Sequence, residues 1–221
     1  MKIGVMDSGI GGLTTLSRLM SVCGGEYVFV RDRKGPYGDK DDAFVMDRTF
    51  LACSKLQSCG ASIIVLACNT ATNVAINKLR ELDGEARYIG IEPAVKPALS
   101  SCKRIAVALT PTAARQEKFL RLISSHRDRI RLITPPTLAA EIEKSYFDVN
   151  ALSALAAELY GKCRGCDGLV LGCTHYIFLK DYLYGIDGKL KIFDGNDGVA
   201  KQLLRFTGKM GESKVEFVEI K

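Results

Sequence analysis

Long apolar runs are absent from this sequence. Its 221 residues contain no stretch of the roughly 18 to 20 apolar residues that a membrane-spanning helix needs. The amino terminus also lacks the pattern of a secretory signal, because a strand-like segment begins at residue 2 with no basic region, apolar core and cleavage site. We therefore expect a cytoplasmic protein with no membrane partner. Its length and its 47% hydrophobic and 25% charged residues suit one large α/β domain or two small ones.

A strong excess of one charge is absent as well. The formal net charge is +6, from 31 Lys and Arg residues against 25 Asp and Glu residues. The densest basic patch is Arg31, Arg33 and Lys34, and acidic residues follow it within 39–42. We interpret this patch as a solvated surface and expect no nucleic-acid partner. The mild positive balance is compatible with an anionic substrate.

Cysteine is abundant, with eight residues. Without a secretory signal we expect free thiols, most of them buried as small hydrophobic side chains. This interpretation suits Cys23, Cys53, Cys59 and Cys102. Cys163 and Cys166 form a CxxC pair, but no second pair completes a zinc site and no thioredoxin-like context surrounds it. We therefore expect no bound metal.

Apolar, β-branched segments alternate with helical patterns along the chain. This alternation predicts parallel sheets with helices on both faces, with ligands beyond the carboxyl ends of the strands. The expected strands are 2–6, 27–30, 62–67, 88–91, 104–109, 130–133, 168–172, 190–193 and 215–219. The expected helices are 12–22, 42–59, 70–82, 113–125, 137–143, 149–162, 176–184 and 197–207.

An internal repeat divides the chain. Residues 63–70 resemble residues 168–175, and each segment is an apolar strand that ends in a small residue, a cysteine and a polar helix start. Residues 2–8 resemble residues 104–110 at a similar offset. The repeat predicts two similar α/β halves joined near 92–103.

The repeated cysteines, Cys68 and Cys173, both stand where a strand gives way to a helix. Backbone N–H groups at a helix start favour a thiolate. One such cysteine would most simply be structural, but two at equivalent positions would face one cleft between the halves. A base on one side of a carbon and an acid on the other is the arrangement that racemisation needs. Asp7 and His175 follow the strands nearby and could assist each thiol, although Asp7 could instead cap the helix at 12–22 and His175 could be a surface group.

A glycine-rich loop at residues 7–13 joins the first strand to the first helix. Such loops bind phosphates or carboxylates through backbone N–H groups. The loop has neither the Gly-Lys-Ser/Thr of a P-loop nor a full GxGxxG, so a nucleotide is weakly indicated and a substrate carboxylate is equally reasonable.

Taken together, these residues resemble the glutamate racemase family, within the aspartate/glutamate racemase superfamily. The resemblance implies an α/β fold of two similar doubly wound parallel-sheet domains with a pseudo-two-fold relation and the active site in the cleft between them. We expect residues 1–92 plus about 195–221 in the first domain and 93–194 in the second. The resemblance implies no pyridoxal phosphate, no other cofactor and no metal, and a homodimer. Five matching segments occur in the family's order: 7–13, 36–40, 67–71, 90–97 and 171–176.

The resemblance also implies the site residues. Cys68 and Cys173 match the two catalytic bases, acting on the D- and L-enantiomer respectively, and Asp7 and His175 match their assisting groups. The matching substrate contacts are Ser8, Tyr37, Gly38, Asn69, Thr70 and Thr174. Asp32 and Glu143 fall near a family aspartate and a family glutamate. This chain departs from the family pattern at Ala113, where a threonine is usual, at Ile177, where a proline is usual, and in its shorter length.

The resemblance therefore implies a cofactor-independent isomerase that interconverts L- and D-glutamate and supplies D-glutamate for peptidoglycan. One alternative is a racemase of the same superfamily that acts on aspartate or another amino acid. Another is a catalytically inert, ligand-binding homologue. A thiol-redox protein centred on Cys163 and Cys166 is a third.

Overall fold

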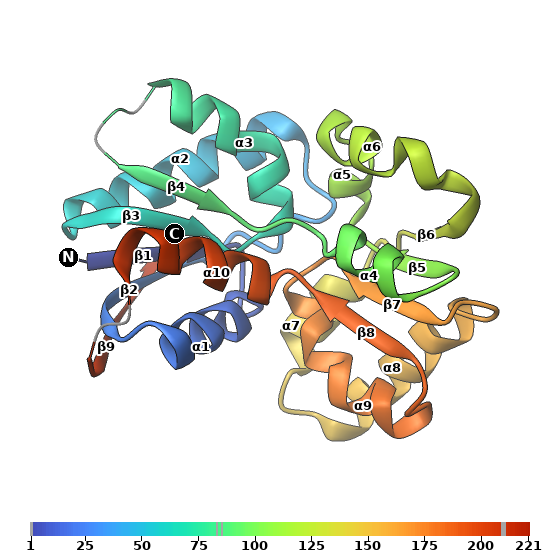
Figure 1. Cartoon of the computed structure of the whole chain (residues 1–221). Coiled ribbons are helices and arrows are strands. Elements are labelled where there is room, and N and C mark those ends of the chain that lie inside the picture. Colours follow the sequence, from blue (N-terminus) through green and yellow to red (C-terminus); the bar gives the residue numbers. More distant parts are fainter. Residues whose placement is uncertain (1, 83, 85, 209–210) are drawn as a thin grey trace.

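The strands form two parallel sheets (Figure 1). The computed structural model describes residues 2–82, 84, 86–208 and 211–221. In this part of the chain, one sheet has five strands in the order β4-β3-β1-β2-β9, and the other has four in the order β6-β5-β7-β8. The strands are β1 (Lys2–Asp7), β2 (Gly25–Asp32), β3 (Ala61–Leu66), β4 (Arg87–Gly90), β5 (Ile105–Ala108), β6 (Ile130–Ile133), β7 (Gly168–Leu171), β8 (Lys191–Asp194) and β9 (Ser213–Ile220).

The two sheets repeat one topology. The order β4-β3-β1-β2 in the first corresponds to β8-β7-β5-β6 in the second. The resembling sequence segments thus occupy equivalent places, with β1 matching β5 and β3 matching β7. The expected α/β fold with two similar parallel sheets is confirmed.

Helices cover both faces of each sheet, because central parallel strands are apolar on both sides. In the first sheet, α2 and α3 pack on one face and α1 and α10 on the other. In the second, α7, α8 and α9 pack on one face and α4, α5 and α6 on the other. The helices are α1 (Gly12–Val22), α2 (Asp42–Ser58), α3 (Asn69–Leu82), α4 (Val95–Ser101), α5 (Pro111–Ala114), α6 (Glu117–Ile123), α7 (Leu138–Ser145), α8 (Val149–Lys162), α9 (Lys180–Ile186) and α10 (Asn196–Thr207), with 3-10 turns η1 (Ser124–Arg129) and η2 (His175–Leu179).

Two expected elements differ from the structure and one helix was not expected, whereas the other elements lie within two residues of their predicted bounds. The single helix expected at 113–125 is wrong, because Gln116 adopts an extended conformation that separates α5 from α6, and η1 follows. The helix expected at 176–184 begins with η2 and continues as α9. The helix α4 was not predicted. Its seven residues are too few for a periodic pattern, and Pro97 in its first turn reads as a helix breaker although that position tolerates proline.

The chain returns to the first sheet at its end. After β8, α10 packs against α1, and β9 then pairs in parallel with β2 (Figure 1). Residues from both ends of the sequence therefore share one sheet. Within the described ranges, none of the helices has the length and apolar character that crossing a bilayer requires.

Candidate active site

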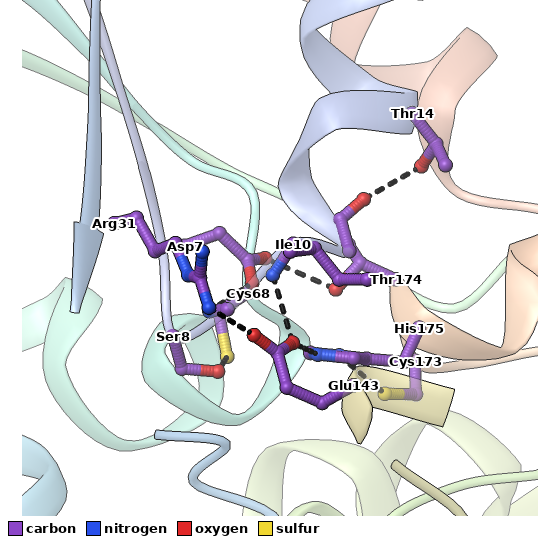
Figure 2. Close-up of polar contacts among 12 residues, drawn as sticks. Asp7, Ser8, Ile10, Thr14, Arg31, Cys68, Glu143, Cys173, Thr174 and His175 are labelled. Carbon is purple, nitrogen blue, oxygen red and sulfur yellow. Dashed lines mark hydrogen bonds and ion pairs between the residues drawn. The ribbon is translucent and has the colours of Figure 1, made fainter. Parts of the chain in front are cut away.

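The two repeated cysteines occupy equivalent places at the carboxyl ends of β3 and β7. Cys68 precedes α3, and its Sγ accepts a hydrogen bond from the Ala71 N–H at 3.4 Å, the position of a helix N-cap. Cys173 precedes η2, so its helical segment is a 3-10 turn rather than the expected α-helix. Both are free and buried, with 5% and 7% of their surfaces exposed. Figure 2 shows Cys68 beside Ser8, at 3.3 Å from Sγ to Oγ, and Cys173 beside His175.

Asp7 ends β1 and is fully buried. Its Oδ1 accepts from the Gly9 N–H at 2.9 Å, and its Oδ2 accepts from the Thr174 hydroxyl at 3.0 Å. Burial raises the pKa of Asp7 to about 6, against the lowering effects of the His175 charge and the two hydrogen bonds. Asp7 is not the cap of α1, since no side chain caps that helix. It is a carboxyl group that exchanges its proton near neutral pH.

His175 is also buried, so the alternative of a surface group is wrong. Its Nδ1 lies 3.9 Å from Cys173 Sγ, and its Nε2 lies 2.6 Å from Glu143 Oε2. Burial alone would lower the pKa of His175, but the hydrogen bonds to Cys173 and Glu143, with the negative charges of Cys173 and Asp7, raise it to about 10. The imidazole is therefore positively charged at neutral pH and lies beside the Cys173 sulfur.

Cys68 has the opposite environment. Burial raises the pKa of its thiol to about 12, the negative charge of Asp7 adds to this effect, and the hydrogen bonds with Ser8 and with the Ala71 N–H offset only part of it. Cys68 therefore holds its proton at neutral pH. The two sulfurs therefore differ in their surroundings. Cys68 is a thiol near the Asp7 carboxyl group, whereas the Cys173 sulfur lies beside the positively charged His175.

Glu143 joins the two sheet-bearing parts of the chain. It lies in α7, yet its Oε2 accepts from the Ile10 N–H at 2.9 Å and its Oε1 from Arg31 Nη2 at 2.8 Å (Figure 2). Burial would raise the pKa of Glu143, but the bonds from His175 and Ile10 and the Arg31 charge hold it below its usual value. Of the basic patch that we interpreted as a solvated surface, Arg33 and Lys34 are exposed, whereas Arg31 is half-buried and makes an ion pair across the site.

Tyr37 and Asp32 belong to a buried network beside the site. The Tyr37 hydroxyl donates to Asp32 Oδ2 at 2.5 Å, and Arg48 donates to both carboxylate oxygens at 2.8 and 2.6 Å. Burial opposes the charge on Asp32, but the bonds from Arg48 and Tyr37 lower its pKa. Asp32 thus holds the Tyr37 ring in place rather than facing the cysteines directly.

The remaining predicted residues lie where loops at the carboxyl ends of the two sheets contact each other. The Thr70 and Thr110 hydroxyls are hydrogen-bonded at 3.0 Å, and the Gly38 carbonyl accepts from the Thr112 N–H at 3.1 Å. Asn69 is buried, and its Oδ1 has no hydrogen-bond partner among the described residues. An acceptor without a partner in such a place suits an ammonium donor.

All ten predicted site residues are buried in one region. The site is therefore little exposed to solvent in this structure, and it lies where the two halves meet. The glycine-rich loop makes this closure possible. A Cβ on Gly9 would overlap Glu143 Oε2, and one on Gly11 would lie 2.5 Å from Thr174 Oγ1.

The departures from the family pattern lie at the edge of this region. Ala113 is buried, and the adjacent Thr112 hydroxyl donates to the Lys40 carbonyl at 2.7 Å, which ties α5 to the loop before α2. Ile177 is half-buried and packs against the core of the second sheet. Thr110, Thr112 and Arg31 were not predicted as site residues, because their contacts depend on how the two halves meet. Thr110 alone had a sequence signal, since it ends the second repeat.

The CxxC pair lies away from this region, at the end of α8. Burial raises the pKa of both Cys163, to about 12, and Cys166, so neither is poised as a thiolate. Among the residues that the structure describes, no three His, Cys, Asp or Glu side chains are grouped to hold a metal ion.

Comparison with known proteins gives relatives over most of the chain. A glutamate racemase from Leptospira interrogans is 39% identical over 212 residues, which cover 92% of this chain and 82% of the relative. Glutamate racemase 2 of Bacillus subtilis is 38% identical over 222 residues, with coverages of 92% and 80%. The crystal structure of glutamate racemase from Campylobacter jejuni has a TM-score of 0.85 at 26% identity, and covers 100% of this chain and 93% of its own. No family model matches the chain.

The paired sheets and these relatives define an amino-acid racemase, an isomerase that interconverts enantiomers. At 39% identity over most of both sequences, the agreement with the Leptospira enzyme decides the family. The chain belongs to the glutamate racemase family.

Proposed function

We propose that this chain interconverts L- and D-glutamate by moving a proton at the α-carbon between Cys68 and Cys173. The observation that carries the proposal is the difference between the two buried sulfurs. Cys173 adjoins the charged His175, whereas Cys68 adjoins Asp7 and keeps its proton. One proton acceptor and one proton donor are what a two-base racemisation needs at the start of each turnover.

With L-glutamate bound, the Cys173 thiolate takes the α-proton, and the Cys68 thiol gives its own proton to the opposite face of the carbanion. The reverse reaction starts from the opposite protonation of the pair. Asp7 is suited to take up the Cys68 proton, because burial brings the pKa of its carboxyl group to about 6. His175, which is already protonated, assists Cys173 by its positive charge instead. The two thiols carry both proton transfers, so the proposed mechanism needs no pyridoxal phosphate and no metal.

The proposed substrate contacts surround the cysteines. Asn69 Oδ1 is the buried acceptor for the α-ammonium group. The hydroxyls of Ser8, Thr70 and Thr174 and the backbone near Gly38 are suited to the carboxylates, and Tyr37, fixed by Asp32, forms one wall. Because these groups are buried, substrate exchange requires the two halves to separate at their contact.

Glutamate is the favoured substrate, because the relatives at 35–39% identity are glutamate racemases. The aspartate and inert-homologue alternatives are not favoured. We further propose the domain division given above, a cytoplasmic homodimer and a role in supplying D-glutamate for peptidoglycan, all of which the family resemblance implies.

The direct test is an assay of each glutamate and aspartate enantiomer by chiral chromatography, without added cofactor. We expect both glutamate enantiomers to reach an equal mixture and aspartate to react much more slowly. If aspartate were racemised faster than glutamate, aspartate would replace glutamate as the proposed substrate. Folded protein that racemises neither amino acid, but binds glutamate by calorimetry, would make the chain an inert homologue.

The close contact at Gly9 gives a further prediction. A Cβ at this position would lie 2.6 Å from His175 Nε2 as well as against Glu143, so the pair must shift to accommodate it. We expect Gly9→Ala to lower kcat/KM about 10²-fold, because a displacement of this size misplaces the reacting groups. Gly198→Ala is the control, since Gly198 lies in α10, where an added Cβ would have no atom within 4 Å, and this change should leave activity unaltered. Normal activity in Gly9→Ala would contradict the proposed tightness of the closed site.

A further inference from the structure

The register of the first sheet places Arg31 between two carboxylates. Arg31 on β2 pairs with Asp7 on β1 and with Glu219 on β9. Successive side chains of a strand point to opposite faces, so the adjacent Asp32 faces Arg48 and Tyr37 instead. Arg31 thus stands at the edge of the sheet that carries Asp7, and it faces the other half of the molecule.

From this position Arg31 completes the set of hydrogen-bond donors around Glu143. Its Nη2 lies 2.8 Å from Glu143 Oε1, and its Nη1 lies 3.6 Å from Glu219 Oε1. The other oxygen of Glu143 accepts from the Ile10 N–H and contacts His175 (Figure 2). Both oxygens of this carboxylate are therefore engaged, and each has a donor from the first half of the chain.

We propose that Arg31 is a positioning residue of the racemase, which holds the Glu143 carboxylate against the His175 imidazole beside Cys173. The inference rests on the proposed two-cysteine mechanism. Arg31 does not contact the sulfurs and acts through Glu143. Its role differs from that of Arg33, which reaches only Glu219, at 3.7 Å, and is largely exposed.

Charge balance explains why Glu143 needs this partner. The Glu143 side chain is only 14% exposed, and a carboxylate with so little access to water is costly unless it is paired. Without Arg31, Oε1 would lose its charged donor, and the carboxylate would be free to turn away from His175. The charged or titratable groups that face His175 are Glu143, Cys173 and Asp7, and Glu143 is the one that Arg31 holds in place.

The partly buried position of Arg31 also costs free energy of folding. Its Nε is buried with no hydrogen-bond partner among the described residues, and an unpaired buried donor is destabilising. The ion pair with Glu143 offsets this destabilisation. Because Arg31 and Ile10 lie in one half and Glu143 and His175 in the other, this contact exists only while the halves are together. Arg31 therefore begins to hold Glu143 only as the site closes.

The experiment uses the fact that the sequence has only two histidines, His126 and His175. Protein labelled with ¹³C-histidine gives two imidazole signals, and His126→Gln assigns them. We expect the titration midpoint of His175 to fall by about one pH unit or more in Arg31→Gln and Arg31→Met, and to be unchanged in Arg33→Gln. Arg31→Met keeps much of the side-chain packing without the charge and serves if Arg31→Gln does not fold. Arg31→Lys, which retains a positive charge, should restore most of the shift.

Kinetics provide the second readout. We expect the Arg31 variants to lower kcat/KM about tenfold at neutral pH, with the alkaline limb of the pH profile displaced downward in parallel with the His175 titration. A His175 titration midpoint that is unchanged or raised in whichever Arg31 variants fold would overturn the proposal, whatever their activity. If the wild-type chain did not racemise glutamate, the proposed function would fail, but the titration would still decide whether Arg31 controls His175.

Discussion

Replacement of either Cys68 or Cys173 by serine is expected to lower kcat/KM for glutamate racemisation by about 10² to 10⁴-fold, the range for loss of a general acid or base. A serine hydroxyl is a far weaker acid than a thiol, so it neither accepts nor returns the α-proton at neutral pH. The two enantiomers are equal in free energy, which requires kcat/KM to fall equally in both directions. Chiral chromatography from each enantiomer measures this loss.

The separate roles of the cysteines become visible in solvent exchange. In deuterium oxide, Cys68→Ser should still exchange the α-proton of L-glutamate, because Cys173 remains to remove and replace it on one face. Cys173→Ser should show the same behaviour with D-glutamate. Proton NMR measures the exchange, and Cys59→Ser, at a half-buried cysteine remote from the site, is the control. Normal racemisation by either site variant would rule out the two-thiol mechanism.

His175→Gln should give the second large effect, a loss of about 10²-fold or more in kcat/KM, because Cys173 then lacks its charged neighbour. It should also change how stability depends on pH. The pKa of His175 is raised from its usual 6.5 to about 10 in the folded protein. A raised pKa in the folded state stabilises the protein below pH 6.5, and this stabilisation is lost as the pH rises through 10.

Thermal denaturation at several pH values tests this second effect. The stability of wild type relative to His175→Gln should be greatest below pH 6.5 and should decline steadily toward pH 10. His126→Gln is the matched control, because His126 is exposed in η1 and its replacement should leave both activity and the pH dependence unchanged. A stability difference between wild type and His175→Gln that is constant from pH 6 to 10 would show that His175 is not held in its charged form.

Much of the fold was predictable because it is encoded locally. Each buried strand is a short apolar run, and the main helices occupy the segments between these runs. The repeat around Cys68 and Cys173 also predicted that β3 and β7 would be equivalent, and both sheets have this order. The predictions failed where a helix was too short to show a pattern, or where tertiary contacts overrode the local helical pattern. In α4 the seven residues were too few, and at Gln116 the extended backbone accompanies side-chain bonds to Asp42 that join the two halves.

The residues of the site were predictable from the sequence, whereas their burial between the two halves was not. All ten predicted residues follow strand ends, so a parallel-sheet fold brings them to one region. The role of Arg31 could not be predicted, because a charged residue near a strand end usually faces water. Its partner Glu143 lies 112 residues away in the sequence. Only the contact between the halves shows that the two residues form a pair.

The return of β9 to the first sheet has a consequence for synthesis. Domains generally fold as units, from the amino-terminal end, while the ribosome is still at work. Here a nascent chain whose second sheet is already complete still lacks the edge strand beside β2, and with it Glu219, the partner of Arg31. The half that emerges first is therefore the half that is finished last, and its unpaired β2 edge stays open to other extended segments until translation has passed residue 220.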